Sequence, residues 1–132
     1  MTERSRLKTV AAGIAFVLAL SCSAQEPNDN CSSLLGSLSV ELRYARNLSA
    51  SVRTTFVCPR DTRALLGASK QRIVNSLGPP DATAAASEGR SAAWSYYFGP
   101  KPEGSYPPGV PELRFEFDQG LAVSRVGCER TR

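Results

Sequence analysis

The sequence has no histidine, and it contains one methionine and one tryptophan among its 132 residues. Without an imidazole there is no Ser-His-Asp or Cys-His arrangement for nucleophilic catalysis, and no histidine-based metal site. The carboxylates offer no clear replacement. Glu116 and Asp118 share one face of an expected strand with Glu112 and Arg114, a pattern typical of a solvated sheet face. We therefore expect no enzymatic activity, no metal and no other cofactor.

The sequence also lacks an apolar run long enough to span a bilayer permanently. The run from Thr9 to Leu20 covers about a dozen residues, whereas about 20 are needed. It follows a basic stretch, Arg4 to Lys8, and it ends at Ser21-Cys22-Ser23-Ala24. A basic start, a short apolar run and a small-residue end are typical of a bacterial-type export signal. We interpret residues 1–24 as a leader that directs the chain out of the cytoplasm.

Two kinds of processing fit the end of this leader. Leu18-Ala19-Leu20-Ser21-Cys22 resembles a lipobox, in which the cysteine is acylated and becomes the new N-terminus. Several acyl chains on one residue hold a protein stably at a membrane. The alternative is ordinary cleavage after Ala24. We favour lipidation of Cys22, which would place the chain in the cell envelope with a lipid anchor.

Little excess charge remains once the leader is set aside. The formal net charge is +4 for the whole chain, and it falls to +2 because three basic residues and one acidic residue lie within residues 1–24. No block of lysine and arginine interleaved with aromatics remains, so we expect no nucleic-acid partner. The rest of the chain is long enough for one small domain.

Cysteine is scarce but informative in an exported chain. If Cys22 carries a lipid or leaves with the leader, then Cys31, Cys58 and Cys128 remain, and three cannot all pair within the chain. We favour a Cys58–Cys128 bridge, because these two flank the expected folded unit while Cys31 lies in a polar approach. A Cys31–Cys58 bridge stays open. Closing a loop of about seventy residues is worth roughly 4 kcal/mol in the chain-entropy model.

Three helices are expected before residue 78. Apolar residues recur at three- and four-residue steps from Leu34 to Val52, which predicts an amphipathic helix. A short helix should begin at Pro59 and end before Gly67. A second short helix, capped by Ser69, should end at Gly78-Pro79-Pro80.

The last third of the sequence alternates as strands do. Trp94, Tyr96 and Phe98 form one such run, and Leu113, Phe115 and Phe117 form another. We expect residues 82–91 to be a link without regular structure. After Asp118 we expect a three-residue loop with Gly120 in the left-handed conformation, which sets Leu121 opposite Phe117 and Val123 opposite Phe115. That register leaves Cys128 away from the core unless the strand ends or twists at Gly127.

These motifs together resemble a known family. Leu66 to Lys70, Leu77 to Asp81, the 94–98 run and the pattern Leu113-x-Phe115-x-Phe117-x-x-Gly120-x-x-Val123 resemble the SmpA/OmlA family. Its members are BamE-like small lipoproteins of the outer-membrane β-barrel assembly machine. The similarity covers residues 59–127 and implies an α+β fold, with two short helices packed on a three-stranded antiparallel meander.

The predicted organisation follows from this resemblance and from the leader. Residues 1–24 form the export signal, residues 25–58 a polar approach and an additional N-terminal helix, and residues 59–132 a BamE-like domain with ααβββ order. The same unit of two helices and three strands is known in secreted β-lactamase inhibitor proteins. The fold alone therefore does not select a role.

One segment suggests a binding surface. The connection from Gly99 to Val110, here called the proline-rich loop, contains four prolines and is much longer than a usual hairpin loop. Stiff loops lose little entropy on docking, so Lys101 and Tyr106 are candidate partner-binding residues. A tolerated surface insertion is the alternative. We expect a non-catalytic envelope lipoprotein, an adaptor or scaffold for outer-membrane protein assembly or envelope integrity. The alternative is a secreted inhibitor or ligand-binding module.

Overall fold

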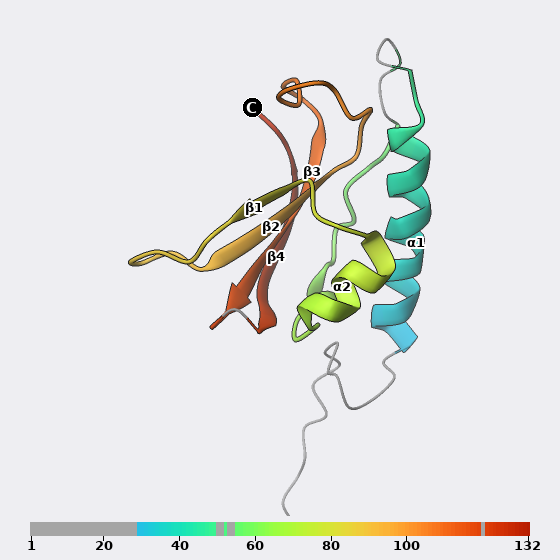
Figure 1. The fold of residues 1–132 in the computed structure, drawn as a ribbon. Coiled ribbons are helices and arrows are strands. Elements are labelled where there is room, and N and C mark those ends of the chain that lie inside the picture. Colours follow the sequence, from blue (N-terminus) through green and yellow to red (C-terminus); the bar gives the residue numbers. More distant parts are fainter. Residues whose placement is uncertain (1–28, 50–51, 53–54, 120) are drawn as a thin grey trace, which may run out of the picture.

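The computed structural model describes residues 29–49, 52, 55–119 and 121–132. Both α-helices lie on one side of a single antiparallel sheet, whose strand order is β1-β2-β3-β4 (Figure 1). In chain order the elements are α1 (Asp29–Arg46), the 3₁₀ turn η1 (Arg63–Leu65), α2 (Lys70–Leu77), β1 (Ala82–Ala84), β2 (Ala92–Tyr97), β3 (Pro111–Asp118) and β4 (Ala122–Arg130).

The α+β class is confirmed, and β2, β3 and β4 form the expected meander. The prediction of three strands is wrong, because β1 adds a fourth strand within the segment expected to be an irregular link. Ala82 pairs with Ser95 and Ala84 with Ala93. β1 is only three residues long and is exposed. Its sequence, Ala-Thr-Ala, has neither the apolar alternation nor the run of β-branched residues that would predict a strand.

The helix predicted to begin at Pro59 is also wrong, because only the three residues of η1 are helical. The chain leaves this turn to pair with the sheet. The Gly67 amide donates to the Val123 carbonyl over 2.8 Å, and the Val123 amide donates to the Ala68 carbonyl over 2.9 Å. By contrast α2 begins as predicted. The Ser69 side chain caps it by accepting from the Arg72 amide, and Gly78 follows it with a φ of 79°.

The N-terminal helix lies earlier than predicted. Its bounds are Asp29 and Arg46 rather than Leu34 and Val52. It ends where the side-chain amide of Asn47 donates to the Arg43 carbonyl over 2.9 Å, satisfying one of the free carbonyls of the last turn. Cys31 therefore lies in the first turn of α1 and is fully buried, not in a polar approach.

One core lies between the helices and the sheet. α1 belongs to it, since its buried stripe packs in the same cluster as α2 and the strands. Tyr96 and Phe115 meet edge to face with ring centroids 6.0 Å apart, and Phe56 stacks on Phe98 at 3.9 Å. The buried residues of this core are Cys31, Leu35, Leu38, Leu42, Ala45, Phe56, Leu65, Ala68, Ile73, Leu77, Tyr96, Phe98, Leu113, Phe115, Phe117 and Val123.

Trp94 is only partly buried, although its alternation with Tyr96 and Phe98 suggested a core position. Its ring packs edge to face on Phe117 at the margin of the core, with centroids 5.0 Å apart. The Lys70 ammonium lies 5.4 Å from the Trp94 ring centre and 5.0 Å from the Phe117 ring centre. A cation over an aromatic face is favourable. Lys70 therefore covers the two rings at the edge of the core.

A bulge sets which side chains of β4 face the core. Phe117 pairs with Val123 but Glu116 pairs with Arg125, so β4 has one extra residue at this point. The predicted register, with Val123 opposite Phe115, is therefore wrong. Gln119 takes a positive φ of 46° in the preceding turn, where we had expected the left-handed residue to be Gly120, which lies outside the described residues.

The bulge also explains the disulfide. Beyond it the alternation of β4 is shifted by one, so that Cys128 pairs with the buried Leu113 and faces the core side. Cys58 and Cys128 form a disulfide with their Cα atoms 5.5 Å apart and 70 residues between them in sequence. This is the pairing that the sequence favoured. Cys31 is also disulfide-bonded, and the cysteines within the described residues include no free thiol.

The sheet face opposite the helices, here called the outer face, is charged. On β3 and β4 it presents Glu112, Arg114, Glu116, Arg125, Gly127 and Glu129. Arg114 and Glu116 are 4.0 Å apart in a partly exposed ion pair. This agrees with the interpretation of the carboxylates as a solvated sheet face.

Candidate functional site

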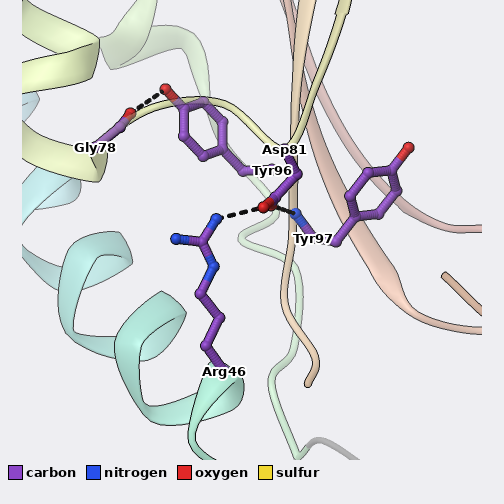
Figure 2. Close-up of polar contacts among 5 residues, drawn as sticks. All are labelled: Arg46, Gly78, Asp81, Tyr96 and Tyr97. Atoms are coloured by element: carbon purple, nitrogen blue, oxygen red, sulfur yellow. Dashed lines mark hydrogen bonds and ion pairs between the residues drawn. The ribbon is translucent and has the colours of Figure 1, made fainter. Parts of the chain in front are cut away.

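The Asp81 carboxylate joins three parts of the fold. It comes from the chain between α2 and β1, and its side chain is only 2% exposed. One of its oxygens accepts from the Arg46 guanidinium over 2.8 Å and from the Tyr97 amide over 2.9 Å (Figure 2). A buried carboxylate is tolerated only with such partners. Asp81 therefore fixes the end of α1 and the start of β1 against β2.

Tyr96 and Tyr97 point to opposite sides of β2 (Figure 2). Tyr96 points to the helices, where its hydroxyl donates to the Gly78 carbonyl over 2.8 Å just after α2. Burial raises the pKa of the Tyr96 hydroxyl well above its ordinary value. Tyr97 lies on the side of the outer face, and its ring stacks on Tyr106 of the proline-rich loop with centroids 4.3 Å apart.

A pocket of about 350 Å³ lies between the proline-rich loop and the strands. Lys101 and Tyr106 both line it, so the structure brings the two predicted partner-binding residues together. The other lining residues are Asp81, Ala82, Tyr97, Pro102, Gly104, Ser105 and Thr131. Lys101 is exposed and supplies the cation of this pocket.

Tyr106, one of the two predicted partner-binding residues, is not fully exposed. Its ring is half-buried on Tyr97, and its hydroxyl is buried without a hydrogen bond of acceptable geometry among the described residues. Burial, and secondarily the negative charge of Asp81, raises the pKa of Tyr106 to about 12. The Arg46 Nε atom is a second buried polar atom without a partner in this part of the structure.

The tyrosine and aspartate groups of this region are either protonated or already paired. The tyrosine hydroxyls hold their protons at neutral pH, and the Asp81 carboxylate is occupied by Arg46 and Tyr97. Three or more potential metal ligands do not cluster anywhere in the described ranges 29–49, 52, 55–119 and 121–132. The Lys101 ammonium group can donate hydrogen bonds to a carboxylate or a carbonyl oxygen of a partner.

Sequence reasoning found the loop residues but missed Arg46, Asp81 and Tyr97. In the sequence Asp81 follows Gly78-Pro79-Pro80, as the end of a turn would, and Arg46 lies off the apolar stripe of its helix, as a solvated charge would. No local signal pairs residues 35 positions apart, because the contact exists only after α1 docks on the sheet. Cys22, the predicted lipidation site, lies outside the described residues.

Comparisons with protein families, with curated proteins and with solved structures find no match for this chain. The resemblance of residues 59–127 to the SmpA/OmlA family therefore stays a prediction from sequence motifs.

We predict that Asp81→Asn lowers the free energy of unfolding by about 2 kcal/mol, because it leaves the half-buried Arg46 guanidinium without a counter-charge. Urea unfolding measures the change. Asp61→Asn is the matched control, since the Asp61–Arg63 pair is solvent-exposed and should contribute little. Equal effects of the two substitutions would contradict the role assigned to Asp81.

We predict that Tyr106→Phe changes the alkaline limb of the stability profile. Since the folded pKa of about 12 lies above the ordinary value of 10, Tyr106 contributes stability that is present below pH 10 and is lost as the pH rises through about 12. Tyr106→Phe should therefore flatten the fall in melting temperature across this window. It should not destabilise at neutral pH, because the removed hydroxyl makes no hydrogen bond of acceptable geometry among the described residues. Tyr44→Phe, on the exposed face of α1, should keep the wild-type profile.

Proposed function

We propose that this chain is a non-catalytic envelope lipoprotein that acts as an adaptor or scaffold at the periplasmic face of the outer membrane. Its role would lie in outer-membrane protein assembly or envelope integrity, through contact with a protein partner. The leader pattern of residues 1–24 supports export, and a disulfide is typical of exported proteins. The motif resemblance supports the link to the SmpA/OmlA family.

The observation that carries the proposal is the preorganised proline-rich loop. Its C-terminal end is tied to the chain after β4, since the Gly109 amide donates to the Thr131 carbonyl and the Thr131 amide donates to the Val110 carbonyl. The Arg130 guanidinium donates to the Gly109 carbonyl over 2.7 Å. With Tyr106 stacked on Tyr97, the loop has little conformational freedom left to lose when a partner binds.

The proposed membrane attachment rests on lipid. Within the described ranges, which begin at residue 29, none of the helices combines the length and the apolar character that crossing a bilayer requires. An acylated Cys22 would supply the anchor, and the polar residues that follow it would connect the anchor to α1.

We predict that the membrane-fraction protein begins at Cys22 and carries acyl chains. Intact-mass measurement should show the lipid, and Cys22→Ser should release or mislocalise the protein while Ser23→Ala should not. A mature N-terminus at Gln25 would contradict the lipoprotein assignment and leave export intact. It would favour the secreted inhibitor or ligand-binding alternative.

Non-reducing peptide mapping of the same sample adds a second readout. A cysteine whose sulfur carries a thioether-linked lipid cannot also form a disulfide. The partner of the disulfide-bonded Cys31 is therefore decisive. If mapping recovers Cys31 linked to Cys22, the lipid anchor is excluded, whereas Cys31 linked to a cysteine of another chain is compatible with an acylated Cys22. The Cys58–Cys128 peptide should appear in either case.

We predict that partner contact depends on the opening of the pocket beneath the proline-rich loop. A photo-crosslinking residue at position 101 should capture one envelope protein, and the same residue at Arg90, in the exposed β1–β2 turn, should not. Lys101→Glu should reduce recovery of that protein about tenfold. The substitution replaces a cation by an anion, so an attractive contact becomes repulsive, which costs more than about 1 kcal/mol of binding free energy. Lys101→Arg should retain most of it.

Replacing residues 100–108 by a short glycine-rich turn, which keeps Gly109 and the buried Val110, should abolish capture through the loop while the chain stays folded, because surface loops tolerate such changes. Undiminished capture by the shortened chain would show that the loop is a tolerated insertion. Turnover of a substrate by the purified chain would contradict the adaptor assignment.

A further inference from the structure

The outer edge of β4 is covered over only part of its length. At its start, Gly67 and Ala68 exchange backbone hydrogen bonds with Val123. Just beyond its end, Thr131 bonds inward to Val110, on the other edge of the strand. Backbone groups alternate between the two edges of a strand, and the bulge shifts that alternation once. The amide and carbonyl groups of Val126, Cys128 and Arg130 therefore point outward, and no described residue pairs with them.

Monomeric proteins protect such edges with proline, with charged side chains, with bulges or with a covering segment. β4 has one bulge, and Cys58 is tied to Cys128. The backbone groups of Val126, Cys128 and Arg130 nevertheless lie beyond the bulge and are unpaired among the described residues.

Residues 122–130 contain no proline. The charges flanking Gly127 on the outer face are Arg125 and Glu129, of opposite sign and equally spaced from the glycine. A second strand with the same sequence, running antiparallel, would meet attraction on both sides of Gly127.

Within one copy, the charge of Glu129 has an unfavourable neighbour across the strand pair. It lies directly opposite Glu112 in the β3–β4 register, and like charges in that position are unfavourable. The neighbouring cation, Arg114, lies opposite Gly127 and contacts Glu116 at 4.0 Å. Among the described residues, neither Glu112 nor Glu129 has a cation within ion-pair distance. A cation supplied at the open edge of β4 beside Glu129 would relieve this repulsion.

We propose that two copies of this chain pair through β4, antiparallel, with a two-fold axis at Gly127. In this register Val126 of each copy exchanges backbone hydrogen bonds with Cys128 of the other, which uses outward-pointing groups on both strands. Arg125 of each copy then lies opposite Glu129 of the other on the outer face. The two sheets become one continuous sheet, and each Glu129 gains the cation that its own chain does not provide.

The outer face around the proposed axis is open. A shallow hollow of about 250 Å³ is lined by Gly127 together with Arg114, Arg125 and Glu129. A Cβ added at Gly127 would meet no atom within 4 Å, so the chain itself has room for a side chain introduced at this position. The pairing involves one short stretch of strand, and such small contacts give weak, concentration-dependent dimers.

The test uses the full chain in a mild detergent. Gly127→Cys should form a covalent dimer under oxidising conditions, because the two introduced thiols would face each other across the axis at a separation that a disulfide spans. Peptide mapping should locate the link at position 127 of both copies. Gly36→Cys, on the exposed face of α1, is the matched control and should stay monomeric under the same conditions.

Sedimentation across a range of concentrations tests the charges. Arg125→Glu and Glu129→Arg should each weaken dimerisation about tenfold, and the double exchange should restore it, because both cross-dimer pairs regain opposite charges. Val126→Pro should abolish dimerisation and Val126→Ala should not, since only proline removes the outward amide. A chain that stays monomeric at every concentration, or a dimer that Gly127→Cys does not crosslink, overturns the proposal.

Discussion

The ion pair between Asp81 and Arg46 holds the two layers of this protein together at the end where its candidate binding pocket lies. Asp81 also accepts from the Tyr97 amide, so one buried carboxylate fixes α1, the approach to β1 and the C-terminal end of β2 at once. The same carboxylate borders the pocket beside Tyr106. Because a buried charge is costly without its partners, the ion pair couples the pocket wall to the packing of the helix on the sheet.

The two faces of the sheet differ in composition. One face carries the aromatic and aliphatic side chains of the core, against α1 and α2. The outer face carries alternating charges with a glycine among them. The bulge in β4 makes this division possible, since without it Cys128 would turn outward and the disulfide to Cys58 could not form. One inserted residue thus decides the disulfide and the direction of the open edge together.

The proposed adaptor role and the proposed self-association use different residues. The loop and its pocket rely on Lys101, Tyr106 and the Asp81 platform, whereas the β4 edge relies on Arg125, Gly127 and Glu129. Neither depends on an ionisation near neutral pH, because no histidine is present and the two pocket tyrosines stay protonated. The two proposals together describe a chain that holds a partner and presents it in pairs.

Local sequence patterns were sufficient for the elements whose signals lie within a few residues. The cap at Ser69, the stop at Gly78 and the alternation from Leu113 to Phe117 each predicted what the structure contains. Tertiary contacts decided the rest. η1 stays a single turn because Gly67 and Ala68 pair with Val123, β1 is a strand because β2 offers it an edge, and Asp81 is buried because α1 lies above it. Each of these contacts joins residues far apart in sequence. Periodicity and propensity carry no information about which distant residues come into contact.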